Sequence, residues 1–415
     1  NKLIAFVLIL AVIFSFCVSF SGQLAFAKTD GSDTVNRVFF YASDKGGADV
    51  YIASAAMDEL KAKSHGNTQT GKNYYATLID QLPTVNYIEG KGLSFDEFVK
   101  FMAGKSNAAG SSSLAFNAQN SDEDKLVLYS NDGGAKEHTA MDLCKTKRYY
   151  FPTLMENFVP IGMAVNNRQA VINAGEEMPA YLAVESNGDR IGNLETEIAA
   201  NGGVLTGCLQ NEIDSENALR LIKPMTVSEL GDENTQASPT ANASSKWIYN
   251  VVLKYDDNAV SPITSQGKVA EPQCKMLLDN NNTLKVTFSC ATPGAEIYHS
   301  LQVDGDEVYG GKVPQYKYDG RAVEIKNFDP TKDIIINYMA VKEGYSDAGV
   351  QKIKSDQYTT ETNPDEPNLT YTLKSDKSQV NVNDKVNLKA ALQTDKNEDV
   401  YGMEYQVAIP AAKFA

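Results

Sequence analysis

Histidine and tryptophan are scarce in this sequence, which has three and one among 415 residues. The histidines are far apart (His65, His138 and His299), and no C-x-x-C pair occurs among five cysteines, so the usual spacing of a zinc or redox site is missing. Motifs of the forms H-E-x-x-H, G-x-S-x-G and G-x-x-x-x-G-K-[ST] are also absent. Nothing therefore indicates a metalloprotease, an α/β-hydrolase or a P-loop nucleotide-binding protein.

Basic residues are also few compared with acidic ones. The chain has 38 Lys and Arg against 53 Asp and Glu, a formal net charge of −15. Neutralising nucleic-acid phosphates requires a basic face, so we expect no nucleic-acid partner. The hydrophobic fraction of 42% is that of a globular protein. At roughly 100–200 residues per domain, the length predicts two to four domains.

The first 27 residues have the layout of a secretory signal peptide. Lys2 supplies the positive charge, Leu3–Phe20 form a largely apolar stretch, and Ala25-Phe26-Ala27 matches a cleavage site. We predict a mature chain that begins at Lys28 and is extracellular or on the cell surface. Its membrane contact would be limited to the N-terminal segment. An uncleaved membrane anchor is the alternative.

Composition divides the mature chain into three segments. Residues 28–258 mix helical and strand patterns, whereas residues 268–358 carry strand and turn patterns. A polar, proline-containing linker at 359–368 precedes further strand patterns at 369–415. The predicted fold class is a multidomain protein, with an α+β N-terminal domain followed by all-β, immunoglobulin-like sandwiches.

Local patterns in the first segment predict individual elements. Ser94-x-x-Glu97 is a capping box, and the apolar residues that follow it repeat with helical spacing. We therefore expect a helix that begins after Ser94 and ends near Gly104. Further expectations are strands at 37–41, 125–130 and 247–255, a helical turn at 140–145, and a helix at 193–200.

Four cysteines follow the predicted signal peptide, and four allow three disulfide pairings. They are Cys144, Cys208, Cys274 and Cys290. Cys274 and Cys290 are equally distant from Asn282, within a strand–turn–strand pattern. A hairpin centred on Asn282 would place them opposite each other, within disulfide reach. Cys144 and Cys208 would then be the other candidate pair, and four free thiols are the alternative.

Several stretches of the first segment follow one another in an order that is known from one family. They are 89–98 (EGKGLSFDEF), 126–134, 138–143, 148–152 (RYYFP), 159–165, 219–222 and 247–253. In this order, residues 75–256 resemble the molybdopterin-binding domain of the sulfite-oxidase-like oxidoreductases, in the divergent secreted form of anaerobic Gram-positive bacteria. The resemblance implies an α+β fold and a molybdopterin cofactor.

The chain departs from that family at its metal ligand. Catalytic members bind molybdenum through a cysteine ahead of the 89–98 stretch, and residues 72–89 contain none. Cys144 is the nearest candidate ligand. A pterin pyrophosphate needs clustered cationic donors, for which the candidates are His138, Arg148 and Arg220. We therefore expect the fold without its cofactor.

The second and third segments resemble accessory modules. Residues 292–300 (TPGAEIYHS) and 340–346 (AVKEGYS) are similar to the hallmarks of the chitobiase/β-hexosaminidase C-terminal-type module, a small immunoglobulin-like sandwich. Residues 369–415 resemble the start of a cohesin-like or bacterial immunoglobulin-like domain. Such a sandwich needs about 100 residues, so we expect this segment to be an incomplete domain.

Together these patterns predict a secreted or cell-surface bacterial protein that binds or displays rather than catalyses. The expected partners are glycans or surface proteins. One alternative is an extracellular oxidoreductase that uses molybdopterin. Another is the accessory region of a carbohydrate-active protein.

Overall fold

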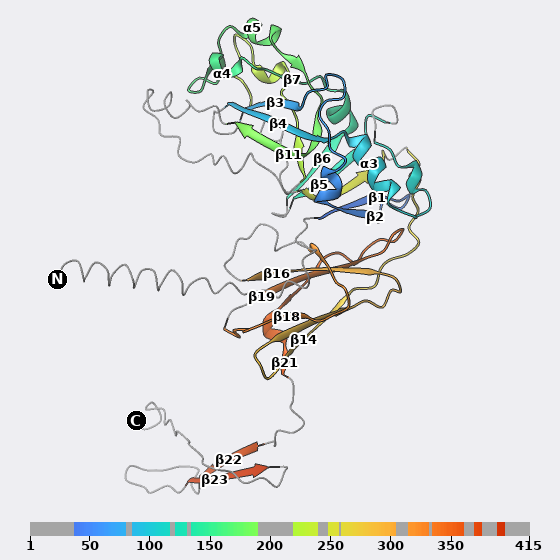
Figure 1. The fold of residues 1–415 in the computed structure, drawn as a ribbon, viewed down its shortest axis with the longest axis vertical. Coiled ribbons are helices and arrows are strands. Elements are labelled where there is room, and N and C mark those ends of the chain that lie inside the picture. Colours follow the sequence, from blue (N-terminus) through green and yellow to red (C-terminus); the bar gives the residue numbers. More distant parts are fainter. Residues whose placement is uncertain are drawn as a thin grey trace, which may run out of the picture.

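The computed structural model describes residues 37–79, 85–116, 121–130, 134–189, 219–239, 248–256, 259–303, 314–331, 334–360, 369–375 and 388–394. Strands outnumber helices in these residues and form several separate sheets (Figure 1). Of the predicted fold class, an α+β domain followed by all-β sandwiches, the predominance of strands is confirmed. The predicted signal peptide, the helix at 193–200 and Cys208 lie outside the described residues.

A five-stranded sheet forms one side of the N-terminal part, by which we mean the described residues from 37 to 256. Its strands, in spatial order, are β2 (Asp49–Ala56), β1 (Arg37–Ser43), β13 (Ile248–Lys254), β5 (Lys125–Ser130) and β6 (Ala135–Thr139). β1 and β13 are parallel, and the other neighbours are antiparallel. Strands form at all three predicted positions, and they lie side by side as β1, β13 and β5.

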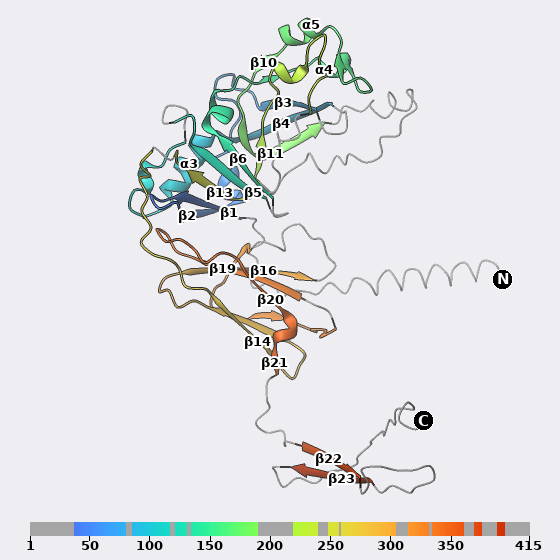
Figure 2. The ribbon, with the colours of Figure 1, turned by 180° about the vertical axis from the view of Figure 1, so that it is seen from behind.

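A second sheet of the N-terminal part has four antiparallel strands. They are β12 (Arg220–Ile222), β11 (Tyr181–Asp189), β4 (Val85–Leu93) and β3 (Tyr74–Ile79). The shorter elements are α2 (Met57–Lys61), β7 (Tyr149–Tyr150), α4 (Leu154–Asn157), β8 (Phe158–Val159), β9 (Ala164–Val165), α5 (Arg168–Asn173) and β10 (Glu176–Glu177). Figures 1 and 2 show α4 and α5 beyond β3 and β4, at the end of the molecule.

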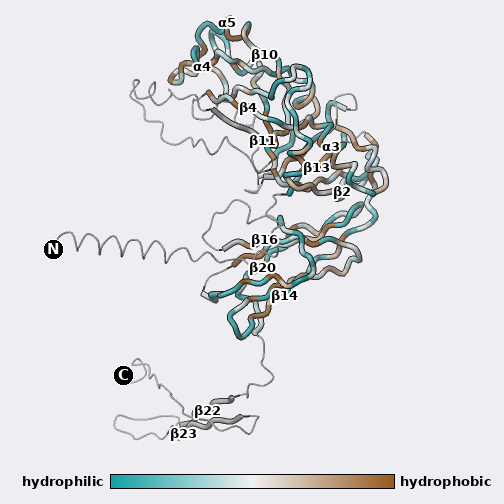
Figure 3. The backbone as a smooth tube through the Cα atoms, viewed as in Figure 1, coloured by the Kyte–Doolittle hydropathy of each residue, from teal (hydrophilic) through white to brown (hydrophobic). Residues whose placement is uncertain are grey.

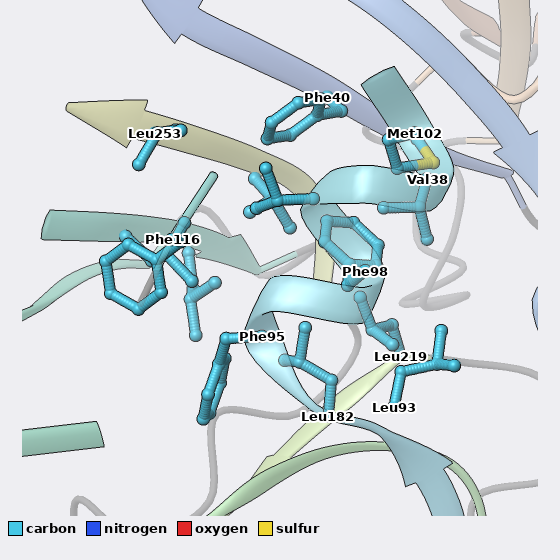
Figure 4. Packing of buried hydrophobic residues seen from close by; sticks show 14 of the residues in the cluster. Val38, Phe40, Leu93, Phe95, Phe98, Met102, Phe116, Leu182, Leu219 and Leu253 are labelled. Carbon is cyan, nitrogen blue, oxygen red and sulfur yellow. The ribbon is translucent and has the colours of Figure 1, made fainter. Parts of the chain in front are cut away.

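Helix α3 (Phe95–Gly104) packs into a core to which both sheets contribute. The predicted capping box is present, because the Ser94 hydroxyl accepts a bond from the Glu97 N–H (3.3 Å) and Glu97 accepts one from the Ser94 N–H (2.8 Å). The rings of Phe40 and Phe98 meet edge to face at 5.8 Å (Figure 4). The buried residues of this helix are Phe95, Phe98, Val99, Met102 and Ala103.

Residues 273–360 form two four-stranded sheets around a second hydrophobic core, and we call this pair the sandwich. One sheet contains β18 (Val323–Ile325), β15 (Leu284–Ser289), β14 (Gln273–Leu278) and β21 (Thr359–Thr360). The other contains β17 (Tyr316–Lys317), β16 (Glu296–Val303), β19 (Ile334–Val341) and β20 (Gln351–Lys354). Val286 of the first sheet and Ile336 of the second are fully buried in this core.

The five-stranded sheet packs directly against strands β16 and β19 of the sandwich. The shared cluster contains Phe39, Tyr41, Tyr51, Val127, Val252, Tyr298, Met339 and Val341. The Phe39 ring meets the Tyr298 ring edge to face at 5.0 Å. Because Val38 and Phe40 of the same strand pack on the side of α3, β1 is buried on both faces, which explains its uninterrupted apolar sequence.

Backbone hydrogen bonds also join the two parts. The Tyr51 N–H donates to the Tyr345 carbonyl (2.9 Å), and the Gly344 N–H donates to the Tyr51 carbonyl (3.0 Å). The Tyr41 hydroxyl donates to the Asp347 carboxylate at 2.6 Å. The predicted 340–346 motif thus contributes to this contact. Beyond the sandwich, β22 (Leu369–Ser375) and β23 (Leu388–Thr394) form an antiparallel pair.

The expected opposition of Cys274 and Cys290 is wrong in register. Leu278 pairs with Leu284, so the hairpin is centred on Asn281, and Cys274 faces Phe288. The turn is closed by the Asp279 carboxylate, which accepts bonds from the N–H groups of residues 281 (2.9 Å) and 283 (3.0 Å). Within the described residues the cysteines are free thiols, namely Cys144, Cys274 and Cys290.

Candidate functional site

His138 and Asp142 lie together at the edge of the five-stranded sheet. Strand β6 pairs His138 with Leu126, and the histidine is only 6% exposed. A π-helical turn (Met141–Lys145) follows, where a short helical turn was expected. It brings an oxygen of the Asp142 carboxylate to 3.3 Å from Nδ1 of His138.

Two basic side chains reach the same carboxylate. Arg148 donates through Nη2 to the Asp142 carboxylate and through Nη1 to the Pro224 carbonyl at 3.1 Å. Lys223, which follows β12 directly, donates through Nζ to Asp142 at 2.9 Å. The sheet edge and the segment after β12 thus meet at one carboxylate. We call Asp142, His138, Arg148 and Lys223 the Asp142 cluster.

The Asp142 cluster is mostly buried and places two cationic side chains against one carboxylate. The side chains of Arg148 and Lys223 are 4% and 12% exposed, against 33% for Asp142. Burial by itself would raise the pKa of Asp142. The hydrogen bonds from His138 and Lys223, and the positive charges of Lys223 and Arg148, instead lower that pKa far below its usual range. Asp142 is therefore ionised at any physiological pH.

Two nitrogen atoms of this cluster have no hydrogen-bond partner among the described residues. Nε2 of His138 and Nε of Arg148 are buried without a hydrogen-bond partner among the described residues. The atoms that do bond, Nδ1 of His138 and Nη2 of Arg148, both meet Asp142. The cluster is thus organised around a protein carboxylate.

Arg220, the third candidate donor, occupies a different strand. It lies on β12 opposite Ala183 of β11 and is 3% exposed. Burial raises the pKa of the neighbouring Tyr181 hydroxyl, and the positive charge of Arg220 partly opposes that effect. Of the three predicted donors, His138 and Arg148 are thus brought together through Asp142, while Arg220 acts on Tyr181.

Cys144, the candidate metal ligand, is an exposed free thiol in the π-helical turn. Partial desolvation of its sulfur, together with the negative charge of Asp96, raises the pKa of Cys144 to about 11. A thiol binds a metal as the thiolate, and at neutral pH this one is protonated. Among the residues that the structure describes, no three His, Cys, Asp or Glu side chains form a group suited to a metal ion.

These residues do not fit a molybdopterin well. A pyrophosphate needs cationic donors that face it, whereas Arg148 and Lys223 are bonded to Asp142. Asp142 already neutralises one of these two positive charges, so less positive charge is left for a pyrophosphate. The nearest candidate thiol is protonated, and Asp96 opposes its ionisation. We therefore derive no chemical step through this cofactor.

Sequence reasoning missed Asp142 and Lys223. The i, i+4 spacing of His138 and Asp142 can be read from the sequence. Whether the two side chains meet depends on the π-helical turn between them. Lys223 lies 81 residues after Asp142 in sequence, and no local pattern links the two. Only the pairing of β12 with β11 places the lysine here.

No helix within the described ranges is long and apolar enough to cross a membrane. Figure 3 shows hydrophobic and hydrophilic residues interspersed along the coloured chain. Comparisons with known proteins returned no matching family model, no matching curated protein and no matching solved structure.

Proposed function

We propose that this chain is a secreted or cell-surface binding protein without catalytic activity of its own. Its N-terminal segment, residues 28–258, would keep a fold like that of the molybdopterin-binding domains and have lost their cofactor. The single observation that supports this most strongly is the Asp142 cluster, in which a protein carboxylate occupies the cations that a pyrophosphate would need.

The remaining segments support a role in binding or display. Residues 268–358 would be an accessory sandwich, which β21 (Thr359–Thr360) extends beyond the predicted start of the linker. Residues 369–415 would belong to a further immunoglobulin-like or cohesin-like domain, joined by the rest of the 359–368 segment. The module that the second segment resembles is usually an accessory spacer or packing domain and not a catalytic one. The apolar contact between β1 and β16 would hold the first two segments in one orientation. Glycans or surface proteins are the proposed partners.

The proposal is tested by metal and pterin analysis of the full chain. The chain is expressed with its N-terminal segment in a secreting host that makes molybdopterin, and purified without chelators. Molybdenum is measured by mass spectrometry and pterin by the fluorescence of its oxidised form. We expect neither at stoichiometric amounts, and a known molybdopterin enzyme from the same host serves as the positive control.

Stoichiometric molybdenum with pterin would overturn the proposal and favour the oxidoreductase. The variant Cys144→Ser would then identify the ligand, because loss of molybdenum with retained pterin assigns the metal to that sulfur. The matched control is Cys274→Ser, which changes a thiol in the sandwich.

A further inference from the structure

Two tyrosine rings lie against each other at the rim of the four-stranded sheet of the N-terminal part. Tyr75 of β3 and Tyr150 of β7 are both partly exposed, and their ring centroids are 5.3 Å apart at an interplanar angle of 35°. Tyr150 also meets the buried Tyr87 ring edge to face at 5.7 Å. The buried ring holds this pair in place, so the rings form a fixed surface and not two independent side chains.

Polar groups from three segments surround these rings. Glu89 of β4 lies opposite Tyr75 and accepts bonds from the Tyr75 hydroxyl (3.2 Å) and from the Asn73 amide (2.6 Å). Glu176 of β10 lies opposite Tyr150. We call Asn73, Tyr75, Glu89, Tyr150 and Glu176 the tyrosine–carboxylate patch.

Within the described residues, no cation neutralises the negative charge of this patch. Both glutamates are exposed, and in the described part of the chain neither has an ion-pair partner. By contrast, the adjacent Glu177 lies 3.8 Å from Lys147. Burial raises the pKa of the Tyr150 hydroxyl, and the charges of Glu176 and Glu89 raise it further. Both carboxylates thus raise the pKa of the same hydroxyl, that of Tyr150.

This combination suits a ligand that carries both an amine and hydroxyl groups. Aromatic faces attract ammonium groups, and the unpaired carboxylates add a charge-assisted hydrogen bond. The second N–H of the Asn73 amide and the free oxygen of Glu89 are suited to sugar hydroxyls. The flat C–H face of a pyranose can lie on a tyrosine ring. A lysine side chain would satisfy the carboxylates alone and would make no use of the amide.

We propose that the tyrosine–carboxylate patch binds glycans that contain sugars with a free amino group. This inference rests on the proposed binding role of the chain and names the chemical class of its partner. The two can fail separately, because the metal analysis does not depend on any glycan.

The test is calorimetric titration of the full chain with three probes, at physiological ionic strength and about pH 6. The probes are a glucosamine hexamer, the fully N-acetylated hexamer and hexalysine. We expect the glucosamine hexamer to bind, and the N-acetylated hexamer to bind at least tenfold more weakly because it carries no ammonium. Hexalysine is expected to bind more weakly than the glucosamine hexamer.

Matched variants assign the binding to the patch. Glu89→Gln should weaken binding of the glucosamine hexamer at least tenfold. Glu185→Gln, which removes an exposed carboxylate from the neighbouring strand β11, should change it less than twofold. Circular dichroism checks that both variants are folded. The proposal is overturned if the hexamer does not bind, if Glu89→Gln binds it as the wild type does, or if hexalysine binds more tightly.

Discussion

The Asp142 cluster and the tyrosine–carboxylate patch both gather charged side chains in the N-terminal part, but they differ in burial and in charge balance. Around Asp142, groups of opposite sign are bonded to one another and mostly withdrawn from water. In the patch, Glu89 and Glu176 carry the same charge and face solvent. A buried charge needs a partner, whereas an exposed one is solvated without any. Removing a partner from the first arrangement should therefore destabilise the fold, whereas the second remains available to a ligand.

The largest effect should come from breaking the buried arrangement. Asp142→Asn leaves Arg148 and Lys223 without their carboxylate, and we expect it to lower the free energy of unfolding by about 3 kcal/mol. Urea titration of the full chain, followed by the signal of the N-terminal part, measures this change. Glu137→Gln is the control, since it removes only the exposed pair with Lys125 and should cost less than about 1 kcal/mol. Equal losses in the two variants would show that the buried cluster matters no more for stability than the exposed ion pair.

A smaller loss is expected when one cation is removed and the carboxylate stays. Lys223→Met keeps the aliphatic length of the side chain and leaves Asp142 bonded to Arg148. We expect a loss of about 1.5 kcal/mol, the order of one hydrogen bond to a charged group. The same urea titration measures it. A loss as large as that of Asp142→Asn would mean that the lysine and not the carboxylate organises the cluster.

The pH dependence of stability separates the two regions further. The folded-state pKa of Asp142 is depressed, so its contribution is complete above the pKa of about 3.9 that it has when unfolded, and is lost as the pH falls below that value. The stability difference between wild type and Asp142→Asn should therefore be constant from pH 5 to 7 and shrink in more acidic solution. Unfolding titrations at a series of pH values test this. A difference that grows on acidification would contradict it.

The smallest effect on stability belongs to the patch. Glu89→Gln replaces one of two exposed carboxylates of like charge, so the free energy of unfolding should change by less than about 0.5 kcal/mol. Its expected effect is on glycan binding alone. Asp142→Asn should instead lower the stability and leave glycan binding unchanged. A loss of stability in Glu89→Gln comparable to that of Asp142→Asn would show that the patch is structural.

The parts of this fold that the sequence predicts are governed by neighbours along the chain. The capping box of Ser94 and Glu97, and the apolar face that follows it, depend on contacts within about two helical turns. The hairpin register was missed by one residue at its centre, because the side chain of Asp279 decides where the turn closes. The sequence separation of the two cysteines alone does not show at which residue the turn closes.

Contacts between distant segments were not predicted, because the sequence does not show which distant residues meet. The run of apolar residues in β1 indicated burial, but not that Phe39 would face Tyr298 of the sandwich while Phe40 faces Phe98. At the candidate site, His138 and Arg148 were identified by residue type. Their role as partners of a buried carboxylate depends on Asp142. Lys223 joins the same cluster because β12 pairs with β11.

Whether the cofactor has been lost is decided by the amount of molybdenum and pterin bound per chain in protein from a molybdopterin-producing host. If the Asp142 carboxylate has taken the place of a bound pyrophosphate, the folded protein contains neither in stoichiometric amount. One molybdenum and one pterin per chain would show that the cofactor is retained and would favour an oxidoreductase.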